Sequence, residues 1–223
     1  MSEGFRLRVK YQITDRLAYL SHLETVRSME RVVRRAGLPF AITEGFNPHM
    51  KIAFGPALPV GAGSHSEYFD LRLREYVSPE LALAALRSAA PENLMPVDCA
   101  YCARGDDAID VMYPVSVWKV ELACGGIDAD DVARAFEQLV DCGFIEVTKT
   151  KGRKTTVKRV EFEGRLVDGP HVTADDDVVT VDFSTFQGSE GALRPDKFIV
   201  AACELMDGPV AIRSLTRIEL REA

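Results

Sequence analysis

The order of apolar patterns along the chain constrains its fold most, because one order occurs twice. Residues 5–11 alternate apolar and basic side chains with a period of two, which predicts a half-buried strand. A helix follows, and Ser21 with Glu24 forms a capping box at its start. The first half is predicted to hold a strand at 5–11, a helix at 20–36, short extended runs at 39–43 and 51–54, a strand at 66–73, a helix at 78–90 and a strand at 94–102.

From about Tyr113 the chain repeats this order of strand, helix, further strands, helix and strand. The repeat predicts an α+β fold of two tandem ferredoxin-like (βαββαβ) units, with antiparallel sheets and helices on one face. We expect the first unit at 1–104, a polar linker at 105–112 and the second unit at 113–223. The second half is predicted to hold strands at 114–124, 144–150, 155–167, 178–184 and 211–222, and helices at 128–142 and 194–206.

The composition indicates an ordinary globular protein, with 47% hydrophobic and 27% charged residues among 223. No segment approaches about 18 uncharged apolar residues, so we expect no signal peptide, no membrane span and a cytoplasmic location. The five cysteines are irregularly spaced and fit reduced thiols. Cys99 and Cys102 form a C-x-x-C without the second ligand pair of a zinc site, so we expect no metal.

The net charge of −7 argues against a nucleic-acid partner, but the charge is unevenly distributed. Residues 1–104 hold 13 Lys and Arg against 11 Asp and Glu, whereas residues 105–223 hold 14 against 23. Basic residues are also clustered within each half. Any contact with RNA is therefore expected to be local.

Four arginines lie on one face of the first predicted helix, opposite its apolar face. Guanidinium groups bind phosphate and carboxylate in a forked, bidentate geometry, so this face predicts an anion-binding surface. The alternative is a solvated face partly neutralised by pairing between Glu30 and Arg34. The four are Arg27, Arg31, Arg34 and Arg35.

Six further cations and no acid occur between residues 149 and 160. The segment is predicted to form a hairpin with its tip at Gly152 and Arg153. It could clamp a nucleic-acid backbone, or its lysines could simply prevent edge-to-edge sheet pairing. The six are Lys149, Lys151, Arg153, Lys154, Lys158 and Arg159.

The loop from 43 to 51 combines chemically capable residues with a glycine and a proline that stiffen the backbone. Phe46 could stack on a base and Asn47 could read an amide edge, whereas His49 with Lys51 could hold a phosphate or move a proton. In the structural alternative, Phe46 is a core anchor, Asn47 forms a turn and His49 is a surface residue. The candidate residues are Glu44, Gly45, Phe46, Asn47, His49 and Lys51.

His22 lies in the first helical turn, on the flank of the apolar face. Together with His49 it could act as acid and base on a phosphodiester. A half-buried structural histidine is the alternative.

The run from Ser21 to Leu73, with its Ser-His-Leu-Glu helix start, Arg34-Arg35-Ala36 and the Glu-Gly-Phe-Asn-Pro-His loop, resembles the radical SAM-linked protein family. These bacterial proteins of unknown function occur beside, or fused to, cobalamin-binding-type radical SAM proteins. The resemblance is strongest over residues 5–75, and Gly191 to Pro195 looks like a second, weaker block. Two departures are Glu24 in place of the more usual Asp, and Met50 in place of a proline, which we expect to loosen the loop slightly.

The resemblance implies a radical SAM protein as partner. This chain lacks the cysteine motif for the iron–sulfur cluster and the motif for cobalamin, so we expect S-adenosylmethionine, the cluster and cobalamin to belong to the partner chain. The first hypothesis is an accessory protein that binds RNA, such as tRNA or rRNA, or another anionic substrate, through the arginine face and the loop. The others are a protein–protein adaptor without RNA contact, and a metal-independent RNA-processing or RNA-modifying enzyme that uses His22 and His49.

Overall fold

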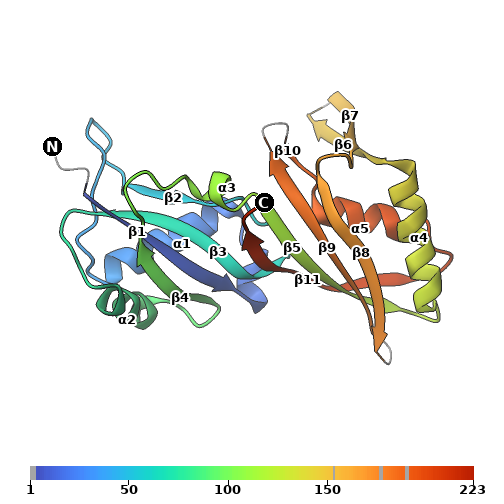
Figure 1. Ribbon diagram of the computed structural model, residues 1–223, viewed down its shortest axis with the longest axis horizontal. Helices are drawn as coiled ribbons and strands as arrows, with labels where there is room; N and C mark the ends of the chain where they lie inside the picture. The colour runs from blue at the N-terminus through green and yellow to red at the C-terminus, as the bar shows by residue number, and fades with distance from the viewer. Residues whose placement is uncertain (1–3, 153, 176–177, 189–190) are drawn as a thin grey trace. The chain divides into compact units, whose positions relative to one another are not determined.

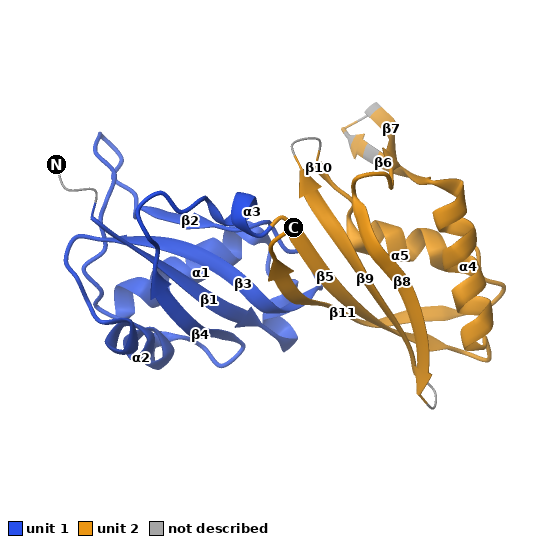
Figure 2. Ribbon diagram, viewed as in Figure 1, with its two compact units in different colours: residues 1–113 blue, residues 114–223 orange. Residues whose placement is uncertain are grey.

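The computed structural model describes residues 4–152, 154–175, 178–188 and 191–223, and it divides into two compact units, 1–113 and 114–223 (Figure 2). Each unit combines helices with an antiparallel sheet (Figure 1). The prediction of an α+β fold with antiparallel sheets is therefore confirmed. Among the described residues, no helix has the length and apolar character that a membrane span requires.

Unit 1 contains one sheet in which four strands lie in the order β2-β3-β1-β4. Alternation along β1 sends Leu7, Val9 and Tyr11 to one face, which α1 and α2 cover. Met29 of α1 and Leu86 of α2 are fully buried in the same core. The elements are β1 (Phe5–Ile13), a 3-10 helix η1 (Asp15–Tyr19), α1 (His22–Arg35), β2 (Ile52–Phe54), β3 (Gly63–Leu73), α2 (Pro79–Ala89), β4 (Leu94–Tyr101) and α3 (Ile109–Met112).

The helix boundaries follow their predicted caps. The Ser21 hydroxyl accepts a hydrogen bond from the Glu24 amide, and the Glu24 carboxylate accepts from the Ser21 amide, so the capping box is confirmed. Ser78 caps α2, and Pro79 occupies its first turn. These caps fix where α1 begins, which places His22 at its first position.

The segment 105–112, expected as a linker, instead packs on unit 1. Ile109 of α3 is buried, and the Tyr113 ring stacks on Tyr68 of β3 at 4.8 Å. Arg8 donates hydrogen bonds to the Met112 sulfur and to the Asp107 carbonyl. A single turn of helix carries too short a periodic pattern to be recognised in the sequence.

Unit 2 contains a sheet in which β9 pairs with β5, β5 pairs with β11, and β8 and β10 both pair with β9. Phe198 of α5 contacts Phe136 of α4 and Phe183 of β9, so both helices cover one face. The elements are β5 (Val115–Cys124), α4 (Ala129–Cys142), β6 (Phe144–Lys151), β7 (Lys154–Glu161), β8 (Leu166–Asp175), β9 (Val178–Gly188), β10 (Gly191–Ala192), α5 (Pro195–Cys203) and β11 (Val210–Arg221).

The predicted strand 155–167 is wrong as a single element. It comprises the end of β7 and the start of β8, separated by a turn in which Gly164 has a φ of +67°. The predicted basic hairpin is present, because β6 and β7 pair along their whole length as a separate two-stranded sheet.

Candidate functional site

The four arginines of α1 are all exposed, opposite the buried Met29 and Val33. Near the end of the helix the Arg34 guanidinium lies 5.2 Å from the centre of the Phe40 ring, a cation–π distance. One turn earlier, Arg31 donates to the Ser28 hydroxyl. Within the described part of the chain, Glu30 makes no ion pair with Arg34. The arginine face therefore keeps its positive charge.

The loop after α1 stands on a hydrogen-bonded stem. The Thr43 amide donates to the His49 carbonyl at 2.8 Å, and the His49 amide donates to the Thr43 hydroxyl at 2.9 Å. Met50 pairs with Ile42 and is buried in the core of unit 1. Met50 therefore anchors the stem, in contrast to the expectation that a methionine in place of a proline loosens the loop.

Residues 44–49 at the tip of this loop are all exposed, and Phe46 is the most exposed large apolar residue of those described, at 107%. The ring buries no surface within the chain, so it is not a core anchor. An aromatic ring held in solvent on a stem of fixed geometry is suited to stacking on a partner. Glu44, Gly45, Asn47 and His49 share the tip, and Gly45 has a φ of +124°.

The stem joins the loop to one end of β3. The Ala41 amide donates to the Arg72 carbonyl, and the Arg72 amide donates to the Lys51 carbonyl. The Arg74 amide bonds the Pro39 carbonyl, and Phe40 pairs with Leu73. Because Arg34 stacks on Phe40, the end of α1 belongs to the same region.

Seven cationic side chains belong to this end of unit 1, which we call the basic end. Arg6 lies opposite Arg72 in the β1–β3 register, and Arg104 lines one recess with both. Acidic residues of the region are Glu44, Asp70, Glu75 and Asp106. Cations therefore outnumber acids here, in contrast to the chain as a whole. The basic end comprises Arg6, Arg34, Arg35, Lys51, Arg72, Arg74 and Arg104.

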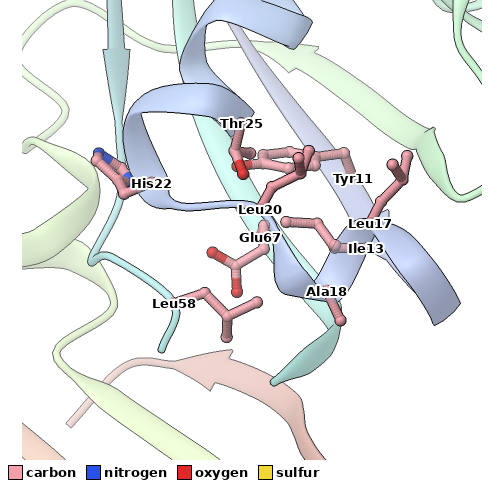
Figure 3. Close-up of a pocket in the computed structure, with 9 residues that line it drawn as sticks. All are labelled: Tyr11, Ile13, Leu17, Ala18, Leu20, His22, Thr25, Leu58 and Glu67. Atoms are coloured by element: carbon pink, nitrogen blue, oxygen red, sulfur yellow. The ribbon is translucent and has the colours of Figure 1, made fainter. Parts of the chain in front are cut away.

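His22 lies at the other end of unit 1, where it lines a small cavity with Glu67 of β3 (Figure 3). Glu67 is only 4% exposed, and Tyr11 and Thr25 are buried beside it. The His22 ring is 6.2 Å from the Phe54 ring, in an edge-on arrangement. The cavity measures about 10 Å³, enough for one water and too small for a substrate.

The structure does not bring the two predicted catalytic histidines together. His22 contacts the Phe54 ring, and Phe54 pairs with Phe69 of β3. The stem of the loop that carries His49 instead bonds to Arg72, three residues and about 10 Å further along β3. A single acid–base pair requires both groups within reach of one substrate bond. This placement disfavours the hypothesis of an enzyme that uses His22 and His49.

The basic hairpin is described only in part. Arg153 lies outside the described residues, and the side chains of Lys149, Lys151 and Lys154 are likewise not described. Lys158 is exposed. The Arg159 guanidinium donates to the Glu161 carboxylate and lies over the Phe144 ring at 3.5 Å, so part of its charge is already paired.

The cysteines are all free thiols. Cys99 is buried on the helix-covered face of β4, and burial raises the pKa of its thiol to about 11. Burial also raises the pKa of Cys102. No cluster of three or more His, Cys, Asp or Glu able to ligate a metal occurs among the residues that the structure describes.

Sequence analysis missed Arg6, Arg72, Arg104 and Glu67. Alternation along β3 puts Glu67 on the same face as Phe69 and Leu71, which was a signal for its burial. Arg6 and Arg72 gave no comparable signal, because their proximity depends on the register between β1 and β3.

A model of a family described as an uncharacterized protein conserved in bacteria (DUF2344) matches residues 6–195. The chain belongs to this family. That description names no activity, substrate or partner, and no curated protein matches the chain. Among solved structures, a chain from a crystal structure of a Cbf5-Nop10-Gar1 complex is similar, with 9% identity and a TM-score of 0.49. The match covers 96% of this chain and 48% of the chain in that complex, so this chain spans about half the length of the solved structure that it matches.

The DUF2344 match spans all of the basic end and stops at Pro195, the first residue of α5. The block from Gly191 to Pro195 has an evident structural role. Leu193 is buried, and Arg194 pairs with Asp196 through two hydrogen bonds at the start of α5. The resemblance to radical SAM-linked proteins stays a prediction, because membership of DUF2344 does not test it.

Proposed function

We propose that this protein binds RNA, with tRNA and rRNA as the expected classes, through the basic end and the loop of unit 1. The proposal depends on one observation above all. The fully exposed Phe46 ring stands on a hydrogen-bonded stem that joins it to a region rich in arginine. Proteins that bind single-stranded RNA combine stacking aromatic rings with a positively charged surface, and this arrangement supplies both.

Each part of the surface has a distinct task in this proposal. Phe46 stacks on an unpaired base, and Asn47 hydrogen bonds to a base edge. The arginines of α1 and Lys51 contact phosphates. The hairpin of β6 and β7 adds backbone contacts, chiefly through Lys158, since Arg159 is engaged by Glu161.

A second part of the proposal concerns the partner. We propose that the bound RNA is presented to a radical SAM protein in the cytoplasm, whose own chain holds S-adenosylmethionine, an iron–sulfur cluster and cobalamin. The resemblance of residues 5–75 to radical SAM-linked proteins supports this partner. The free thiols support a cytoplasmic location, since the cytoplasm keeps cysteines reduced. Co-purification of the two proteins that survives nuclease treatment is the expected result.

The finer fold assignment supports an RNA-binding role only by analogy, and we state it as a proposal. The order β2-β3-β1-β4, with helices after β1 and after β3 on one face, is that of a ferredoxin-like unit. In unit 2, β8-β9-β5-β11 with α4 and α5 follows the same order, and β6 and β7 form an inserted hairpin. Two tandem ferredoxin-like units therefore remain our interpretation.

Replacing Phe46 by alanine tests the proposed function. In fluorescence anisotropy with a labelled single-stranded oligoribonucleotide, Phe46→Ala should weaken binding about tenfold, because one base–aromatic stack is lost. The melting temperature should not change, since the ring is not packed. Tyr19→Ala is the matched control, because Tyr19 is an exposed aromatic in η1, at the His22 end of unit 1. Absence of RNA binding at low salt by the wild-type protein contradicts the proposal.

A further inference from the structure

An open recess of about 850 Å³ lies at the basic end, within unit 1. Its walls come from the start of β1, the end of β3 and the turn after β4. A volume of this size suits a small organic molecule or one nucleotide. Its principal lining side chains are Phe5, Arg6, Arg72, Tyr76, Tyr101 and Arg104.

One wall of the recess is aromatic and held in place. The Tyr76 ring stacks on Tyr101 at 5.2 Å, and Phe5 meets both rings edge-on at 5.7 and 6.0 Å. The Tyr101 hydroxyl donates to the Val77 carbonyl and accepts from the Val77 amide, which fixes the wall. Phe5 and Tyr76 are nevertheless 42% and 61% exposed. A fixed ring system with exposed surface is a platform on which a base can stack.

The recess also carries positive charge. Arg6 and Arg72 lie directly opposite each other on β1 and β3, and like charges in that position repel. The nearest carboxylate to Arg6 is that of Asp70, at 3.9 Å. It already accepts two hydrogen bonds from Arg8, at 2.7 and 2.9 Å, so its charge is largely used there.

The turn after β4 fixes the direction of one of these arginines. The Arg6 guanidinium donates to the Asp106 carbonyl at 2.6 Å, and the Asp106 carboxylate accepts from the Ala103 amide at 2.7 Å. Arg104 is exposed on the same turn. An anion between these guanidinium groups would receive forked hydrogen bonds.

We infer that this recess binds a single unpaired nucleotide, with its base stacked on the Tyr76 ring and its phosphate between Arg6 and Arg72. The inference deepens the proposed function and rests on it for one point, the source of the nucleotide, which is a segment of bound RNA. A free nucleoside monophosphate carries the same chemistry, so the test separates the two sources.

Isothermal titration calorimetry of the full chain with AMP, adenosine and inorganic phosphate tests the recess. AMP should bind at least tenfold more tightly than either fragment, because only AMP engages both walls. Tyr76→Ala should weaken AMP binding about tenfold. Arg72→Gln should remove the preference for AMP over adenosine. If Arg72→Gln fails to fold, Arg104→Gln takes its place in the test and should reduce that preference. Tyr19→Ala should leave AMP binding unchanged.

Equal affinities for AMP and adenosine, no AMP binding up to about 10 mM, or unchanged AMP binding in Tyr76→Ala would overturn the inference. Oligoribonucleotide binding identifies the source. If Tyr76→Ala weakens RNA binding, RNA supplies the nucleotide; if it weakens only AMP binding, the recess takes a free nucleotide. AMP binding by a protein that binds no RNA would refute the proposed function and support the recess.

Discussion

Arg8 and Asp70 form an ion pair on the sheet face opposite α1 and α2. Their side chains are 9% and 8% exposed, and two hydrogen bonds join them in a bidentate arrangement. Asp70 raises the pKa of Arg8 further above its ordinary value, so the Arg8 guanidinium is charged at every working pH. Arg8 also bonds to Met112 and Asp107, which ties the α3 segment to the sheet.

Removing one partner of this pair should be far more harmful than removing both. Asp70→Asn leaves a buried guanidinium without its counter-charge, so we expect a loss of about 3–5 kcal/mol in the free energy of unfolding, measured in urea. The double variant Arg8→Met, Asp70→Leu should recover most of that loss, because the buried Arg8 guanidinium and its counter-charge are removed together. Equal destabilisation by the single and the double variants would show that packing, rather than charge, dominates.

The exposure of single residues was predicted well where the repeat of a helix or strand decides which face a side chain occupies. The helical repeat correctly placed the arginines of α1 in solvent. For Phe46 two readings remained open, because a loop has no period that separates an anchor from an exposed ring. Glu67 had the right alternation for burial, but its neighbour across the sheet, Tyr11, is 56 residues away in the sequence.

At the scale of elements, α1 shows how local chemistry fixes a helix start. The hydrogen bonds from Ser21 to the Glu24 carboxylate lower the pKa of Glu24 below its ordinary value of 4.5. A depressed folded-state pKa means that the capping box stabilises the fold above pH 4.5. That stabilisation is lost as the pH falls through the lower, folded-state value.

Ser21→Ala should therefore cost about 1 kcal/mol at pH 7 and less at pH 3. Urea unfolding at both pH values measures this. Ser78→Ala is the matched control, because Ser78 caps α2 by accepting from the Leu81 amide without a reciprocal glutamate bond at that helix start. Its cost should be the same at both pH values. A pH dependence shared by the two variants would contradict the role of Glu24.

Elements with strong local signals were predictable, and their partners were not. Caps and periods located α1, α2 and α4, and alternation located β1 and β3. The α3 turn and the break between β7 and β8 were missed, since each depends on a few residues. The recess at the basic end was also missed, because it needs Arg6 and Arg72 opposite each other, a register that neither strand specifies alone.

At the scale of the whole molecule, the net charge of −7 coexists with a concentrated positive region in unit 1. Averaging over 223 residues hides this region, because the acids lie mostly in the second half. Counting charges along the sequence showed that the two halves differ in net charge, but it did not show which cations lie together on the surface. Folding adds Arg6, Arg72, Arg74 and Arg104 to the helix arginines, and this increases the local field available to an anion.

The salt dependence of RNA binding should measure how many of these charges contact phosphates. Each phosphate contact to a single strand contributes about 0.7 to the slope of log affinity against log salt. The triple variant Arg31→Gln, Arg34→Gln, Arg35→Gln should therefore reduce the magnitude of the slope by about 2. Lys158→Gln should reduce it by about 0.7 if the hairpin contacts the same RNA. The control is Arg134→Gln on α4, whose charge is paired with Asp131 and should not alter the slope. A slope that stays constant in both the triple variant and Lys158→Gln would mean that RNA binding uses neither these three arginines of α1 nor Lys158, whatever the affinity.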